Sequence, residues 1–182
     1  MSESIDRKRR LLLAAGGAAL ISSFVRPAAA AIGIGNVRSL AFANLHTGER
    51  LGVDYWVDGQ YVPDALTAVN RVLRDFRTGE VHPIDPKLLD CLDALRVKLE
   101  TREPVQVISG YRSPLTNAKL HDASTGVASN SLHMRGMAID IRIAGRPLNS
   151  LRLAALSLQR GGVGYYPRSD FVHVDVGRVR TW

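Results

Sequence analysis

Two short apolar segments each carry one polar residue at their centre, and this pattern constrains the fold most. Ile139-Asp140-Ile141 and Val172-His173-Val174 both alternate as expected of strands that bury one face. An unpaired carboxylate in such a strand is costly, so Asp140 needs a partner. His133 lies upstream in a segment with no strand pattern. We expect the two strands to be adjacent, with the three polar side chains close together.

Two histidines and one carboxylate form the minimal protein ligand set of a catalytic zinc site, with a fourth position left for water. Spacing alone leaves other interpretations open for each residue. Asp140 could form a salt bridge with an arginine on its own face of the strand, since alternation places Arg142 there. His173 could be a core histidine with its hydrogen bonds satisfied.

Two further carboxylates flank His173. Asp170, three residues before it, could accept the proton of a metal-bound water, or could simply be a turn residue. Asp175, two residues after it and on the same face, could hold the second imidazole nitrogen. It could equally pair with Arg178 or Arg180.

A further candidate follows a short strand, in the segment 109–113. Arg112 would supply a planar, permanent cation for a substrate carboxylate or a developing oxyanion. It could instead tie the turn to a helix end. His46, His82 and His121 have no ligand spacing, and we interpret them as surface or turn residues.

The remaining pattern predicts an α+β fold. Apolar periodicity and turn residues predict strands over 37–61 (with a turn at 46–49), 105–108, 136–143, 163–166 and 171–176, and helices starting at Pro63, Pro86 and near Pro114 and over 148–159. Residues 123–131 are small and polar and predict a loop.

The N-terminus has the pattern of an export signal. A basic stretch at 7–10 precedes an apolar run at 11–24, too short for a stable membrane span, and small residues at 27–31 offer a cleavage site. Arg9-Arg10 before a run of modest hydrophobicity favours the twin-arginine route. A general secretory signal or a retained anchor are the alternatives. All of them place the domain outside the cytoplasm, and the twin-arginine route implies the periplasm or an outer surface.

Composition supports one working domain, residues 32–182, after a signal peptide at 1–31. The 182 residues carry a net charge of +7, but without the first 31 the chain has 19 basic and 15 acidic side chains, or +4. Basic and aromatic residues do not cluster, which argues against nucleic-acid binding. The single cysteine, Cys91, lies in an apolar helical pattern and is expected to be a buried thiol.

Three motifs resemble the zinc D-alanyl-D-alanine peptidase family. They are Ser109-Gly110-Tyr111-Arg112-Ser113, the spacing of Ser131, His133, Gly136, Ala138 and Asp140, and Phe171-Val172-His173-Val174-Asp175. The resemblance extends from about residue 37 to Trp182 and is strongest to the murein endopeptidase subgroup, which shares segments such as 45–49 and 161–166.

That resemblance implies a fold shared with lysostaphin-type peptidases and hedgehog signalling domains, in which a small antiparallel sheet with flanking helices carries one Zn²⁺. It implies that His133, Asp140 and His173 are the metal ligands. By the same resemblance Asp170 is the general base, a position that is Glu in some relatives. Arg112 is then the substrate clamp, and we expect its neighbour Ser113 to contact substrate as well.

The implied reaction is hydrolysis of an amide by a zinc-activated water, with Asp170 as proton acceptor and Arg112 stabilising the oxyanion. The implied substrates are the peptide stems and cross-links of peptidoglycan, cut in the periplasm by a monomer during cell-wall remodelling. One alternative is a D,D- or L,D-carboxypeptidase that trims stem peptides. Another is a non-catalytic, zinc-containing wall-binding module, which an intact Asp170 disfavours.

Overall fold

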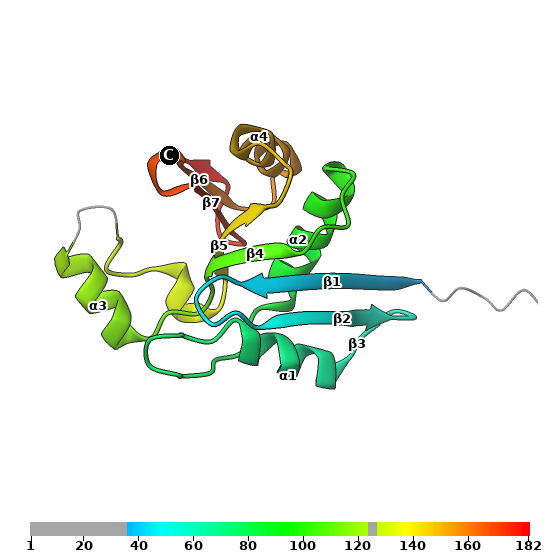
Figure 1. Ribbon diagram of the computed structural model, residues 1–182, viewed down its shortest axis with the longest axis horizontal. Coiled ribbons are helices and arrows are strands. Elements are labelled where there is room, and N and C mark those ends of the chain that lie inside the picture. The colour runs from blue at the N-terminus through cyan, green and yellow to red at the C-terminus, as the bar shows by residue number, and fades with distance from the viewer. Residues whose placement is uncertain (1–35, 124–126) are drawn as a thin grey trace, which may run out of the picture. The chain divides into compact units, whose positions relative to one another are not determined.

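The alternating segments pair into one sheet of eight strands in the computed structural model, which describes residues 36–123 and 127–182 (Figure 1). The strands are β1 (Val37–Asn44), β2 (Arg50–Val57), β3 (Gln60–Tyr61), β4 (Val105–Ser109), β5 (Ala138–Ile143), β6 (Gly162–Tyr166), β7 (Phe171–Asp175) and β8 (Arg180–Thr181). Their order across the sheet is β3-β2-β1-β4-β5-β7-β6-β8. The expected signal peptide at 1–31 lies outside the described residues.

The α+β class with flanking helices is confirmed, and the sheet is mixed rather than wholly antiparallel. Five strand pairs are antiparallel, whereas β4 runs parallel to β1 and β8 runs parallel to β6. The parallel β1–β4 pair joins the N-terminal hairpin to the strands that carry the predicted site. The expected adjacency of the strands of Asp140 and His173 is confirmed, because these two residues are direct partners in the β5–β7 register.

Each expected helix is present: α1 (Pro63–Val72), α2 (Pro86–Lys98), α3 (Pro114–Ala123) and α4 (Leu148–Leu158). Three of them begin with proline, whose fixed φ suits the first helical turn. Asp85 caps α2 by accepting a hydrogen bond from the backbone N–H of Lys87 at 2.9 Å. Within the described ranges, no helix is both long enough and apolar enough to cross a membrane.

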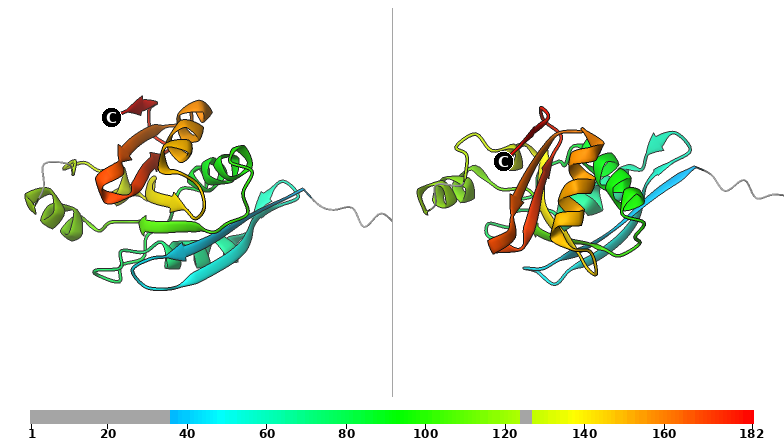
Figure 2. Two further views of the ribbon diagram at one scale, coloured as in Figure 1. Left: turned by 45° about the horizontal axis from the view of Figure 1, so that its top comes forward. Right: turned by 90° about the horizontal axis from the view of Figure 1, so that it is seen from above.

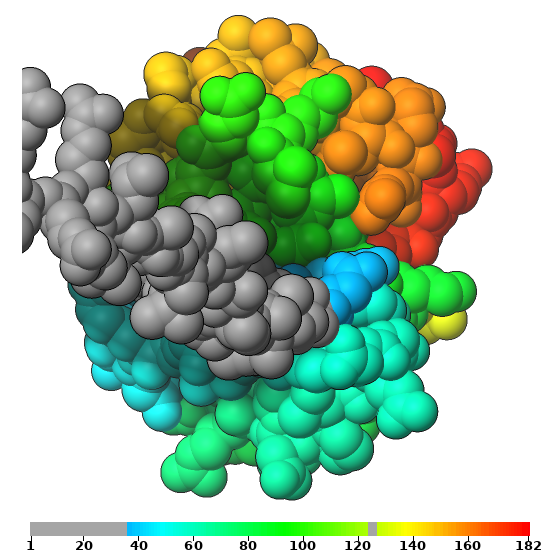
Figure 3. All heavy atoms as spheres, turned by 90° about the vertical axis from the view of Figure 1, so that its right-hand side faces the viewer, coloured from blue at the N-terminus to red at the C-terminus, as the bar shows by residue number. Residues whose placement is uncertain are grey.

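One face of the sheet is apolar and is covered by helices, and we call it the core face. Figure 2 shows α2 and α4 on this side, and Figure 3 shows them next to each other. Ile139 and Ile141 of β5 and Val172 and Val174 of β7 lie in this core. Cys91 of α2 is buried here as expected, and burial raises the pKa of its thiol to about 11.

The opposite face of β5 and β7 carries the polar residues, and we call it the site face. Alternation along the two strands sends Asp140 and His173 to this face, because their neighbours point into the core. Two single-turn elements and the short β8, which had not been expected, complete its surroundings: η1 (Leu132–Arg135) and η2 (Pro167–Ser169) are 3₁₀ helices.

Candidate metal centre and active site

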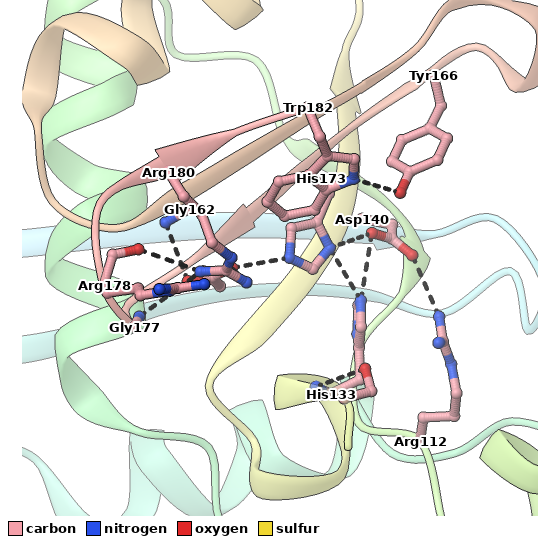
Figure 4. Close-up of polar contacts among 12 residues, drawn as sticks. Arg112, His133, Asp140, Gly162, Tyr166, His173, Gly177, Arg178, Arg180 and Trp182 are labelled. Atoms are coloured by element: carbon pink, nitrogen blue, oxygen red, sulfur yellow. Dashed lines mark hydrogen bonds and ion pairs between the residues drawn. The ribbon is translucent and has the colours of Figure 1, made fainter. Parts of the chain in front are cut away.

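The site face holds a cavity of about 520 Å³. His133, Asp140 and His173 form its floor, and their candidate ligand atoms all lie within 4.8 Å of one another. All three side chains are buried. Figure 4 shows them pointing toward one another from η1, β5 and β7. The fold therefore brings together the three residues that the sequence analysis named as candidate metal ligands.

His133 is positioned by the tight turn of η1. Ser131 caps this turn by accepting a hydrogen bond from the backbone N–H of His133, and Gly136 ends it in the left-handed conformation, with φ of 63°. A Cβ on Gly136 would also lie 2.2 Å from the carbonyl oxygen of Pro83, so only glycine fits. The His133 Nδ1–H donates to the carbonyl oxygen of Gly110 at 2.8 Å, which leaves Nε2 free to face the cavity.

His173 has the opposite ring orientation. Its Nε2–H donates to Asp175 Oδ2 at 3.1 Å, which leaves Nδ1 facing Asp140 Oδ1 at 2.9 Å. Asp175 has no exposed side-chain surface, and it also accepts hydrogen bonds from Arg180 and from the backbone N–H groups of Gly162 and Gly177. Asp175 therefore contacts His173 and, of the two arginines considered, Arg180.

Three atoms with free lone pairs converge in this arrangement. Besides the 2.9 Å contact, His133 Nε2 lies 3.2 Å from His173 Nδ1 and 3.3 Å from Asp140 Oδ1. Three acceptors that close to one another repel unless a proton or a metal cation lies among them. A tetrahedral zinc site with bonds of about 2.0–2.1 Å separates its ligand atoms by about 3.3–3.4 Å. Donor types, orientations and spacing therefore fit one divalent metal ion.

The electrostatics agree with a cation site. Burial alone would raise the pKa of Asp140, but the charge and hydrogen bonds of His133 and His173 outweigh it and hold that pKa below its usual value. Burial alone would lower the pKa of His173, yet its hydrogen bonds to Asp140 and Asp175 raise it. Metal binding needs the unprotonated Nδ1 of His173, so a raised pKa makes protons compete more strongly for this site, and metal binding becomes weaker as the pH falls.

Arg112 lies beside the triad in the cavity, as expected from the sequence. Its Nη2 lies 3.3 Å from Ser109 Oγ and 3.4 Å from Asp140 Oδ2, the carboxylate oxygen that faces away from the histidines. Its side chain is only 10% exposed, and its buried Nε has no partner within the described part of the chain. The guanidinium thus retains donor capacity beside the cavity.

Asp170 lies at the edge of the site rather than in the cavity. It ends η2 in the left-handed conformation, and its carboxylate, with a side chain 62% exposed, forms an ion pair with Arg142. Arg142 is held in turn by Gln106 Oε1 at 2.9 Å. The proposed base must leave this ion pair to reach the triad.

Ser113 also lies outside the cavity lining. It is buried at the start of α3, where its hydroxyl accepts from the backbone N–H of Thr116 and its own N–H donates to Asp75. This placement gives no support to substrate contact. Burial raises the pKa of Asp75, but hydrogen bonds from Thr116 and Ser113 outweigh burial and lower it to about 2.

The cavity residues that the sequence analysis did not anticipate include Tyr166 and Trp182. Strand alternation could have predicted that Tyr166 faces the cavity. Gly164 of β6 pairs with His173, and Tyr166 lies two residues further along the same face. The three other histidines lie away from the triad: His46 stacks on Phe76, His82 on Tyr111, and His121 contacts Val127.

Comparison with protein families and with known proteins gives one consistent result. A family model described as peptidoglycan L,D-endopeptidase MepK matches residues 33–182. The peptidoglycan L,D-endopeptidase MepK of Escherichia coli K12 is 45% identical over 181 residues, which cover 99% of this chain and 100% of the relative. The probable peptidoglycan L,D-endopeptidase MepK of Haemophilus influenzae is 43% identical over 180 residues, 98% of this chain and 97% of the relative. By these similarities the chain belongs to the peptidoglycan L,D-endopeptidase MepK family of metal-dependent peptidases.

Proposed function

We propose that this protein is a zinc-dependent murein endopeptidase that hydrolyses L,D peptide bonds in the cross-links of peptidoglycan. The observation that carries the proposal is the convergence of three lone-pair atoms at 2.9–3.3 Å on the floor of a cavity. The L,D specificity rests on the names of the relatives. His133, Asp140 and His173 are the proposed ligands.

Zinc is the metal that this donor set favours, because two imidazoles and one carboxylate with an open fourth position are typical of catalytic zinc. When bound, it would supply Lewis acidity, which lowers the pKa of a water to about 7 and polarises a peptide carbonyl. Gly110 and Asp175 hold the two imidazoles in the tautomers that this role needs.

Arg112 is the proposed clamp for the substrate. Its guanidinium lines the cavity beside the triad, and its side-chain contacts among the described residues are the long ones of Nη2, so it can donate to a substrate oxygen without first losing a strong ion pair. The distance of 3.4 Å to Asp140 is long for a charge-assisted hydrogen bond. We expect Arg112 to orient the substrate and to stabilise charge on its carbonyl oxygen.

Asp170 remains the proposed proton acceptor, on the condition that its carboxylate turns away from Arg142. This turn is inexpensive, because exposed ion pairs contribute only about 0–1 kcal/mol and these two side chains are 62% and 39% exposed. After the turn, an Asp170 carboxylate oxygen would take a proton from the attacking water and return it to the leaving amine.

The walls of the cavity favour internal cleavage over trimming of chain ends. Ala128, Asn130, Ser169 and Trp182 all line the cavity and are exposed, so its rim is open to solvent. An open site admits a peptide that continues on both sides of the cut bond. A carboxypeptidase needs a closed end that recognises a free terminal carboxylate, and it remains the second candidate.

The substrate places the enzyme in the periplasm, where peptidoglycan is accessible. We propose export by the twin-arginine route, because Arg9-Arg10 precedes an apolar run of modest hydrophobicity. Replacing both arginines with lysine should keep the protein in the cytoplasm, while processing through a general secretory route would leave export intact. We also propose a monomer, which sedimentation of the purified protein would test.

Digestion of intact sacculi by the purified, zinc-loaded domain of residues 32–182 tests the activity, with mass spectrometry of the released muropeptides. Loss of cross-linked dimers and gain of monomers is expected, and the products identify the bond. Release of terminal residues alone would make the protein a carboxypeptidase. No release with zinc bound would favour the non-catalytic module.

Two substitutions test the role of Asp170. Asp170→Asn should keep zinc but lose most of the activity, and Arg142→Gln, which frees Asp170, should retain activity. Full turnover by Asp170→Asn would exclude Asp170 as the base.

A further inference from the structure

Tyr166 and Trp182 form a hydrogen-bonded pair in the wall of the cavity. The indole Nε1–H of Trp182 donates to the phenol oxygen of Tyr166 at 2.7 Å, and the indole ring centroid lies 5.2 Å from that of His173 (Figure 4). We infer that the Tyr166 hydroxyl donates a hydrogen bond to the carbonyl oxygen of the scissile peptide, and that Trp182 is a positioning residue acting through Tyr166. This inference rests on the proposed peptidase function.

The direction of the hydrogen bond carries the argument. An indole N–H can only donate, so the phenol oxygen of Tyr166 must be the acceptor. The phenol's own proton is therefore not used in this contact. Among residues 36–123 and 127–182 it has no other hydrogen-bond partner, and Tyr166 lines the cavity. A substrate oxygen is the acceptor that this geometry leaves for it.

The pair is held from several sides. The backbone of Trp182 is hydrogen-bonded to both neighbours of Gly164. Its N–H donates to the Val163 carbonyl oxygen at 3.3 Å, and its carbonyl oxygen accepts from the Tyr165 N–H at 3.1 Å. The indole then lies on Gly164, where a Cβ would come within 2.7 Å of the ring. A larger residue at this position would displace the indole.

Stacking contacts restrict both rings further. Tyr166 stacks on Phe171 with centroids 4.6 Å apart, and the Arg180 guanidinium lies over Trp182 at 4.8 Å. Trp182 is nevertheless 48% exposed. The indole is thus held by its own backbone, by contact with Gly164 and by the Arg180 guanidinium, yet it remains open to the cavity. Such a side chain is suited to orienting another group rather than to filling a core.

The chemistry needs such a donor. The carbonyl oxygen of a peptide gains negative charge as water adds, and a preorganised neutral donor at that oxygen contributes about 10²–10³-fold to kcat. Hydrogen bonds in a chain polarise one another, so donation from Trp182 strengthens the O–H of Tyr166 as a donor. In Figure 4, Tyr166 and Arg112 lie on opposite sides of Asp140, so the two donors can approach a substrate from different directions.

A double-mutant cycle tests both roles. Tyr166→Phe, Trp182→Phe and the double variant are compared by kcat and KM on purified cross-linked muropeptides. We expect Tyr166→Phe to lower kcat by about 10²-fold with little change in KM, and Trp182→Phe to lower it less. In the Tyr166→Phe background, Trp182→Phe should have no further effect on kcat, because its route of action is gone.

The chain offers matched controls for both substitutions. Tyr165→Phe removes a hydroxyl from the same strand, where the side chain packs toward the core instead of the cavity. Trp56→Phe changes the only other tryptophan, which lies on β2 against Arg38. Both controls should keep the wild-type kcat.

A second measurement does not depend on activity. The two tryptophans give two indole N–H signals in a ¹⁵N correlation spectrum, which Trp56→Phe assigns. Tyr166→Phe should shift the Trp182 signal with or without metal, whereas Tyr165→Phe should leave it in place. An unmoved Trp182 signal would overturn the positioning role of Trp182, which acts through this hydrogen bond.

The possible outcomes separate the two proposals. Wild-type protein that cleaves no muropeptide would overturn the proposed function. An active wild type with an equally active Tyr166→Phe variant would overturn the inference alone. A loss from Trp182→Phe that persists in the Tyr166→Phe background would overturn the positioning role of Trp182.

Discussion

The substitution Asp175→Asn should reverse the tautomer of His173 and weaken metal binding. Oδ1 of Asp175 accepts from the backbone N–H groups of Gly162 and Gly177 at 3.0 and 2.8 Å, while Oδ2 accepts from His173 Nε2 at 3.1 Å. These two backbone donors fix the orientation of an asparagine, whose carbonyl oxygen must stay on their side. Its NH₂ group then faces His173 Nε2.

That NH₂ group cannot accept the proton of His173 Nε2–H. The imidazole avoids a clash between two donors only by moving its proton to Nδ1, the atom that faces the metal site. Loss of a supporting partner of a metal-bound histidine costs about 10–100-fold in affinity, which corresponds to about 1.4–2.7 kcal/mol. We expect zinc affinity to fall by at least this factor. The substitution removes the hydrogen bond that holds the metal-binding tautomer, and it also favours the opposite tautomer.

The metal-free protein should also lose stability. Arg180 Nη2 lies 2.7 Å from Asp175 Oδ2 and would face the same NH₂ group. Breaking a buried ion pair costs about 3–5 kcal/mol. The Arg180 side chain is 30% exposed and can regain water, so we expect the lower end of that range.

Two titrations measure these effects: competition for zinc with a chromophoric chelator, and urea denaturation of the metal-free protein. Asp93→Asn is the control, because Asp93 pairs with Arg96 on α2 at 3.0 Å, away from the site. It should leave zinc affinity unchanged and cost less than about 1 kcal/mol. An Asp175→Asn variant that binds zinc as tightly as the wild type would refute the tautomer argument.

Three further predictions concern Gly136, Asp75 and His173. Gly136→Ala should destabilise the protein by more than about 2 kcal/mol, since its Cβ would meet the Pro83 oxygen at 2.2 Å. The control is Gly145→Ala, where φ is 68° but the space is open; it should cost only about 1–2 kcal/mol in urea denaturation. The folded-state pKa of Asp75 is about 2, below its ordinary value of 3.8, so its contribution to stability is present above about pH 4 and is lost as the pH falls toward 2; Asp75→Asn should flatten the stability curve in that window, and an unchanged slope would contradict this. His173→Ala should retain no zinc after dialysis, and a chelator should lower the melting temperature of the wild type but not of this variant.

Local sequence patterns were enough to single out Asp140 and His173 as candidate ligands that lie together, although they left other roles open for each residue. The alternation around Asp140 and His173 placed both on one face, and a carboxylate in an apolar strand demanded a partner. The same parity placed Asp175 beside His173, where it contacts both His173 and Arg180. Each of these inferences needs only the period of a strand, which is fixed by backbone geometry.

The remaining features depend on contacts between segments far apart in the sequence. Asp170 turns to Arg142, and nothing local to η2 indicates which cation on another strand it meets. Trp182 reaches the cavity because β8 adds to the edge of β6, and two residues are too few to show a period. The position of Ser113 indicated a structural role as well as substrate contact. Serine before proline is typical of a helix start, and the Ser113 hydroxyl does accept a hydrogen bond from the first turn of α3.

The register of β5 and β7 links the candidate metal site to correct strand pairing. Asp140 and His173 are direct cross-strand partners, so a slip of one residue would put Val172 or Val174 opposite Asp140 and send the imidazole to the other face of the sheet. A chain with slipped strands has only two of the three ligands in one place and gains little from the metal. Metal present during refolding should therefore increase the yield of correctly paired chains, and the ion would act as a template for the sheet as well as a cofactor.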